Sequence, residues 1–292
     1  MDKHGHDYDA EATALFGEFQ SPLQQKITPQ LFVKLPMDGG YLNQRSCGYR
    51  VESVLSFESA YTQIGGNPEE MEEKKEPGSN TLVTAVVEGL NVLDVVTADK
   101  VVAQISTKHP KREDGYIPKI NFVGTRFENL RIAGRKIEPK LNLDLFEEKP
   151  PNDARYTQSP SFKKAVLDQH ATIQQRHTGF ENLIEGFLGR FNLVPESFRE
   201  MPPDEEVVEC SLVNTVEDYD EKHCFGHVIR VPHFGTIYLA TLKLTHSKCE
   251  VKGGYGTKTL LELTMLDIQM GCAATGHVSA SVGKTNGMPS VG

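Results

Sequence analysis

Apolar and polar residues alternate along much of the chain, and this pattern predicts β-strands. The alternation is regular over residues 49–66, which are expected to form one long strand. A Gly-Gly pair at 39–40 precedes this segment, so we expect a hairpin in which it pairs with residues 31–36. Residues 81–105 are rich in Val, Leu and Thr, which favours two or three short strands over a helix.

The C-terminal third of the chain shows the same strand pattern. Residues 207–216, 227–232 and 235–251 fit strands. The last of these carries apolar residues on both faces at first, which indicates a central position in its sheet. Strand and helix both fit residues 257–272, and the glycine turn at 253–256 favours a strand.

One segment follows a helical period instead. In residues 162–191 the apolar side chains recur mostly three, four or seven positions apart, and Ser161 is suited to cap the start of a helix. Two glycines within the segment leave open a division into two helices. The proline-rich stretches 149–160 and 193–206 separate this segment from the strands on either side.

These elements predict a mainly β fold, a sandwich or a distorted barrel with one helical insertion. The expected segments are a flexible N-terminal arm (1–27), a first β half (28–148), a helical insertion with proline-rich linkers (149–205), a second β half (206–272) and a flexible tail (273–292). We expect the second β half to complete the same domain as the first, although two separate domains stay open.

Charge and hydropathy exclude two kinds of partner. The 31 Lys and Arg residues stand against 40 Asp and Glu, giving a net charge of −9, whereas proteins that bind nucleic-acid backbones need clustered positive charge. We therefore expect no nucleic-acid partner. No apolar run reaches the roughly 18 residues that cross a bilayer, so no membrane span is expected.

Cysteine usage and the first residues of the chain indicate the compartment. The 5 cysteines contain no CxxC pair, which suits a reducing environment with free, mostly buried thiols. Residues 1–16 are charged and rich in histidine, unlike the apolar centre of a secretory signal. A cytoplasmic location is the expectation.

The densest group of side chains capable of binding a metal consists of His223, Cys224, His227 and His233. A zinc site needs three or four such ligands converging in a tetrahedron. His223 and His227 would share a face only on a helix, whereas Gly226 and the following Val-Ile-Arg-Val run indicate a turn and a strand. Ordinary turn and strand-edge histidines are the simpler interpretation, and a zinc site is the alternative.

No motif identifies a reaction centre. The spacing of Gly271 and Gly276 resembles part of a phosphate-binding loop, but His277 stands where such a loop has lysine. The acidic pairs lie in segments typical of turns, where solvated carboxylates are common. No catalytic residues and no cofactor are therefore predicted, and an enzyme is less expected than a noncatalytic protein.

Residues 81–139 contain the motif GLNVLDVVTADKV followed by FENLRIAGRKI. This segment resembles one found in uncharacterised bacterial β-rich proteins and is similar to part of predicted surface proteins of the choice-of-anchor type. The resemblance implies a shared β module and supplies no catalytic residues.

The expected function is that of a noncatalytic structural or interaction protein that self-associates through β surfaces into a homo-oligomer. The small-residue tail at 273–292 would then add as a strand to a neighbouring subunit. Two alternatives stay open: a metal-dependent enzyme or binder using residues 223–233, and a carrier of a small apolar ligand.

Overall fold

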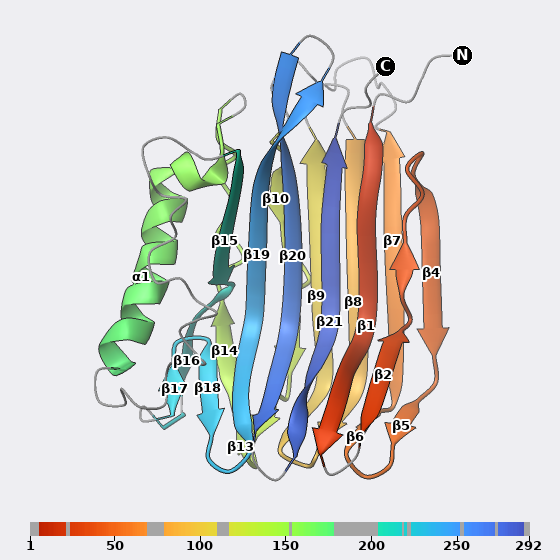
Figure 1. Ribbon diagram of the computed structural model, residues 1–292, viewed down its shortest axis with the longest axis vertical. Coiled ribbons are helices and arrows are strands. Elements are labelled where there is room, and N and C mark those ends of the chain that lie inside the picture. Colours follow the sequence, from red (N-terminus) through yellow and green to blue (C-terminus); the bar gives the residue numbers. More distant parts are fainter. Residues whose placement is uncertain are drawn as a thin grey trace.

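Two large antiparallel sheets lie face to face in the computed structural model of the protein (Figure 1). The structure describes residues 6–21, 24–68, 79–109, 117–151, 154–177, 204–217, 219–220, 223–251, 254–271 and 274–288. We call the two sheets sheet A and sheet B.

Sheet A follows the spatial order β17, β18, β19, β20, β21, β1, β2; in addition, β15 pairs with β19 and β3 pairs with β1. The bounds of these strands are β17 Cys224–Phe225, β18 Val228–Val231, β19 Gly235–Val251, β20 Gly254–Gly271, β21 Thr275–Met288, β1 Asp7–Ser21, β2 Gln25–Gln30, β15 Glu205–Ser211 and β3 Val33–Lys34.

Sheet B follows the order β13, β12, β9, β8, β6, β5; in addition, β10 and β11 pair with β9, and β7 lies between β8 and β4. The bounds are β13 Arg135–Lys136, β12 Arg131–Ile132, β9 Val96–His109, β8 Ser79–Val92, β6 Leu55–Phe57, β5 Tyr49–Val51, β10 Lys119–Asn121, β11 Arg126–Glu128, β7 Ser59–Pro68 and β4 Gly40–Ser46. A separate pair of strands joins β14 (Glu138–Leu141) to β16 (Val213–Glu217).

The core lies between the two sheets. Strands β1 and β21 of sheet A pack on β8 and β9 of sheet B, and the apolar side chains of all four strands face one another. The sheets approach closely where inward positions are small. A Cβ atom added to Gly283 would lie 3.2 Å from Val83 Cγ1 and 3.4 Å from Ile105 Cδ1. Small residues here therefore allow the branched side chains of sheet B to fill the interior.

The alternation of inward and outward side chains switches at one row that crosses sheet A. At the switch, two consecutive residues face the core in each of four neighbouring strands: Ala14 and Leu15 in β1, Ala280 and Ser281 in β21, Met265 and Leu266 in β20, and Leu239 and Ala240 in β19. Ala240 and Ser281 have positive φ angles of 45° and 52°. Each strand therefore presents odd-numbered residues inward on one side of this row and even-numbered residues on the other.

Helix α1 (Pro160–His177) lies beside β15, at one side of sheet A (Figure 1). An aromatic cluster fixes its first turn. The ring of Phe146 lies 5.0 Å from that of Phe162 in α1 and 4.8 Å from that of Tyr156 in the short 3-10 helix η2 (Tyr156–Gln158). Tyr156 Oη also donates a 2.8 Å hydrogen bond to the Pro118 carbonyl oxygen, so η2 and α1 are attached to the sandwich.

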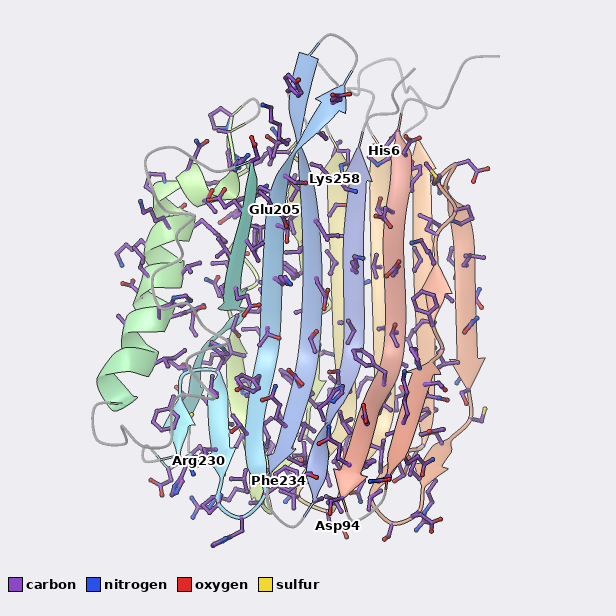
Figure 2. All side chains as sticks on the ribbon, in the orientation of Figure 1. His6, Asp94, Glu205, Arg230, Phe234 and Lys258 are labelled. Carbon is purple, nitrogen blue, oxygen red and sulfur yellow. The ribbon has the colours of Figure 1, made fainter. Side chains whose placement is uncertain are left out.

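The two ends of the sandwich carry different residues. Figure 2 shows His6 and Lys258 near one end, and Asp94 and Phe234 near the opposite end. Asp94 lies in the turn between β8 and β9, and Phe234 in the turn between β18 and β19.

The mainly β sandwich with a helix inserted between two groups of strands is confirmed. The strand expected at 257–272 is also confirmed, because residues up to Gly271 belong to β20. The helix expected over 162–191 is present as far as His177, and the rest of that range lies outside the described residues.

Both ends of the chain differ from the expectation. Within the predicted arm (1–27), residues 7–21 form β1, and within the predicted tail (273–292), residues 275–288 form β21. These two strands pair with each other inside sheet A. Their inward positions are mostly Ala, Ser and Gly, which give a weak apolar signal although they are buried.

The predicted hairpin also differs. Residues 49–66 are divided among β5, β6 and β7, because a turn with Glu52 at a φ of 46° interrupts the strand. The partner of β7 is β4, whereas residues 33–34 pair with β1.

Candidate functional site

The predicted metal-binding residues lie close in sequence but in different surroundings. His223 precedes β17, and its Nδ1 lies 3.2 Å from Asp220 Oδ2 at a partly exposed position. Cys224 is buried in β17, and its Sγ donates a 3.5 Å hydrogen bond to the Gly226 carbonyl oxygen. This thiol is directed to the local turn.

The other two histidines, His227 and His233, also lie in different surroundings from each other. His227 is buried, and burial, together with the nearby His170, lowers its pKa to about 3. His233 is exposed in the turn between β18 and β19, with a φ of 60°. Among the described residues, no group of three or more His, Cys, Asp or Glu side chains is arranged to hold a metal ion. The geometry therefore gives the zinc alternative no support.

A buried polar cluster was not predicted from the sequence. Glu206 in β15 is 2% exposed, and its Oε2 accepts hydrogen bonds from Arg155 Nη1 at 3.3 Å and from Thr157 Oγ1 at 2.9 Å. Burial raises the pKa of this carboxyl group, while the hydrogen bonds from Thr157 and Arg155 act in the opposite direction. The ion pair attaches η2 to the sheet.

His246 in β19 lies directly opposite Glu206 in the pairing of β15 with β19. Its Nδ1 is 3.1 Å from Thr259 Oγ1, and its ring stacks on that of Tyr156 at a centroid distance of 6.3 Å. Burial, followed by the charge of Arg155, lowers the pKa of His246 to about 3. Since Glu206 and His246 are both buried, this cluster serves to anchor η2 and β15 and offers no open reaction centre.

A second buried cluster, which contains a pair of imidazoles, lies at the end of the sandwich marked by His6 in Figure 2. His6 directly precedes β1, and His109 ends β9. The centroids of their rings lie 4.3 Å apart, and the ring of Tyr8 packs edge-on against that of His6 at a centroid distance of 4.6 Å. His109 Nε2 lies 3.2 Å from Thr107 Oγ1. Burial lowers the pKa of both histidines, that of His6 to about 4. Both rings therefore stay neutral at pH 7.

The edges of the sheets are the feature most relevant to binding, because an edge strand presents backbone groups that can pair with another chain. The edge at β15 is covered by α1. Gln169 Nε2 donates to the Ser211 carbonyl oxygen at 2.8 Å, and the Ser211 N–H donates to Gln169 Oε1 at 3.0 Å. The ring nitrogen of His170 lies 3.1 Å from the Glu209 carbonyl oxygen. Side chains thus occupy positions that a further strand would take.

Two other edges are protected by different means. The short strands β10, β11 and β12 pair along β9. Strand β2, at the edge of sheet A, carries exposed Lys26 and Pro29. Lysine and proline are residues with which natural edge strands prevent unwanted pairing.

Strand β4 lacks these protections. It pairs with β7 on one side, and within the described part of the chain no strand pairs with its other side. Tyr41 is 58% exposed and Leu42 is 39% exposed, and as neighbours in a strand they point to opposite faces. Phe32 and Met37, which lie on either side of β3 and precede β4, are also exposed. Four of the seven exposed large apolar side chains found in the described residues therefore lie between residues 32 and 42.

The remaining sequence predictions concern thiols and membranes. Cys47, Cys210, Cys224 and Cys249 are free thiols, and Cys210 and Cys224 are buried, whereas Cys272 lies outside the described residues. In the portion of the chain that is described, no helix has the length and apolar character to cross a membrane.

Comparison with known proteins gives one match. No curated protein and no solved structure matches the chain, so the similarity of residues 81–139 to choice-of-anchor-type proteins stays a prediction. A family model matches residues 6–245, a range that includes most strands of both sheets. Membership of an uncharacterised family is thereby confirmed. The chain belongs to the family described as Domain of unknown function (DUF8256).

Proposed function

We propose that this protein is a noncatalytic interaction protein that self-associates through the free edge of β4. The observation that carries the proposal is the exposed pair Tyr41 and Leu42 on an edge strand that no other described strand covers. A second copy of the chain is the occupant that fits this edge, because two identical strands can pair in antiparallel fashion about a two-fold axis.

The sequence of β4 suits such pairing. If the axis passes at Asn43, Tyr41 lies opposite Arg45 of the partner subunit, and Leu42 lies opposite the partner's Gln44. A guanidinium beside an aromatic ring is attractive. Arg45 is the one charged residue in Gly40–Ser46, so joining two copies of β4 brings little repulsion despite the net charge of −9.

The location of the edge differs from the one expected from the sequence. Strand addition by residues 273–292 is not part of this proposal, since residues 275–288 already pair with β1 and β20 as β21. The surface available for association is instead the opposite side of the sandwich from α1, where Figure 1 places β4.

Sedimentation velocity of the full chain over a range of micromolar concentrations tests the proposal. The expected result is a species of twice the single-chain mass. Tyr41→Lys and Leu42→Lys should each weaken the dimer about tenfold or more, because each replaces a central apolar contact with a charge. Tyr41→Lys also places a positive charge opposite Arg45 of the partner subunit, where like charges repel. Tyr255→Lys is the matched control, since Tyr255 is a comparably exposed tyrosine, at 65%, on a strand of sheet A.

A monomer at 100 µM for the unaltered chain would overturn the proposal. So would a dimer that both β4 variants leave unchanged, because association would then use another surface. Circular dichroism of each variant establishes that the β4 substitutions leave the fold intact.

A further inference from the structure

The outer face of sheet A contains a hollow that the proposed dimer does not use. It has a volume of about 720 Å³ and lies over β19, β20, β21 and β1. This volume falls within the range of small-molecule sites, roughly 300–1,000 Å³. Strand β4 belongs to the other sheet, so the hollow and the dimer edge are separate surfaces.

Four hydrogen-bonding side chains form the floor of the hollow. Asp267 in β20 pairs with Ser279 in β21, and in the next row Gln269 pairs with His277. Ser279 Oγ lies 3.5 Å from Asp267 Oδ1. These residues face outward because their neighbours in the strand, such as Ile268, belong to the core. The floor thus offers both donors and acceptors.

The position of the floor follows from the row of sheet A at which the inward side of each strand changes. Beyond the row at Leu266, the even-numbered residues of β20 point inward, so the odd-numbered Asp267 and Gln269 point into the hollow. Asp267 is only 7% exposed and Ser279 only 6%, although both lie on the outer face. The surrounding side chains therefore make this a recess and not a flat sheet surface.

Charged side chains of opposite sign alternate along one wall of the hollow. Lys243 in β19 lies directly between Glu209 in β15 and Glu262 in β20 in the strand register. Opposite charges on adjacent strands attract, so this row presents alternating polarity. Three carboxylates, those of Glu209, Glu262 and Asp267, against one ammonium make the lining unfavourable for a polyanion such as a phosphorylated ligand.

An apolar surface lies beside the polar floor. Phe16 in β1 is directly opposite Ser279 and is partly exposed in the hollow. On the other side, Tyr238 is opposite Asp267, but its ring packs against Ile173 and Phe225. One partly exposed ring next to a floor of mixed donors and acceptors matches a ligand that has many hydroxyl groups and one apolar face.

We propose that this hollow binds a neutral oligosaccharide. Sugar hydroxyls both donate and accept hydrogen bonds, as the floor residues do, and the C–H face of a pyranose ring packs on an aromatic side chain such as Phe16. A charged amine is the competing ligand class, because the lining carries an excess of carboxylates.

Saturation-transfer-difference NMR and titration calorimetry on the full chain test this site. The probes are maltotetraose, cellotetraose and chitotetraose, with spermidine as the charged amine. The expected result is binding of at least one tetrasaccharide, weakened about tenfold or more by Gln269→Ala and by His277→Ala, a loss typical of removing a contact near the centre of a site. Gln63→Ala is the matched control, since Gln63 is a half-buried glutamine on the outer face of sheet B.

Failure of all three tetrasaccharides to bind would overturn the proposal, and so would binding of spermidine alone. Tetrasaccharide binding that neither Gln269→Ala nor His277→Ala weakens would place the ligand elsewhere and also overturn it. Tyr41→Lys should bind the same tetrasaccharide with unchanged affinity, which separates this site from the proposed dimer edge.

Discussion

Ser281 in β21 donates a 2.9 Å hydrogen bond from its hydroxyl to the backbone carbonyl oxygen of Val101 in β9. Both residues are buried between the two sheets, so a polar contact connects sheet A to sheet B within the core. Ser281 also has a φ of 52° and stands at the row where the inward side of the strand changes. This hydrogen bond therefore connects the two sheets at the row where the inward side of β21 changes.

We expect Ser281→Ala to lower the free energy of unfolding by about 1–2 kcal/mol, because a buried hydrogen bond is lost while the positive φ remains. Urea unfolding followed by circular dichroism measures the change. Ser106→Ala is the control, since Ser106 is exposed on β9, and it should alter stability by less than about 0.5 kcal/mol. Equal effects of the two substitutions would contradict a role for the contact between the sheets.

The sequence pattern predicted the long strands well where their inward residues are large. In residues 235–251 it found apolar side chains on both faces and indicated a central strand. The structure gives a further reason, because the inward face of β19 changes at Leu239 and Ala240. A change of face cannot be distinguished from two buried faces by hydropathy alone, since both place apolar residues at consecutive positions.

The terminal strands were missed for a related reason. Inward residues of β1 such as Ala10 and Ala12, and Gly283 in β21, are small, while the outward residues of β1 are largely acidic. The sequence pattern therefore suggested that both ends of the chain are flexible. Their burial depends on the larger side chains of the facing sheet, Val83 and Ile105, which a local pattern does not include.

The prediction of site residues from the sequence has the same limit, because a local pattern does not include contacts between distant segments. His223, Cys224, His227 and His233 are close in sequence and were therefore noticed. Arg155 and Glu206 are 51 positions apart, and only the fold brings them together. The β4 edge was not predicted, because which strand is left uncovered depends on which edges the helix and the short strands cover.

The contact between Gln169 and Ser211 predicts how α1 protects β15. We expect Gln169→Ala to destabilise the protein by about 1–3 kcal/mol, because the buried N–H and C=O groups of Ser211 both lose their partner. Hydrogen exchange measured by NMR should show a faster Ser211 amide in the variant. Lys164→Ala on the exposed side of α1 removes only a surface ion pair with Asp168 and should change stability by less than about 0.5 kcal/mol. An unaltered Ser211 exchange rate in Gln169→Ala would contradict this role.

The buried ion pair of Arg155 and Glu206 predicts a non-additive result. Arg155→Met should lower the free energy of unfolding by about 3–5 kcal/mol at pH 7, because it leaves the buried carboxylate of Glu206 without its cation. The double variant Arg155→Met with Glu206→Met should be more stable than Arg155→Met alone, because no unpaired charge is left in the interior. Chemical denaturation of the single and double variants completes the cycle. Strictly additive losses would show that the two side chains do not depend on each other.

The histidine pair of His6 and His109 predicts how stability varies with pH. Burial lowers the pKa of His6 to about 4, against an ordinary value of 6.5, so the unfolded chain binds its proton more readily than the folded chain does. The stabilisation that neutral His6 contributes is fully present above pH 6.5. The free energy of unfolding falls by roughly 3 kcal/mol as the pH drops from there to about 4, for a shift of this size. His6→Phe should therefore lose less stability than the unaltered protein between pH 6.5 and 4 in urea titrations at each pH. His233→Gln, at an exposed turn, is the control and should follow the unaltered protein. Parallel curves for His6→Phe and the unaltered protein across this window would show that the buried pair does not govern the loss of stability in acid.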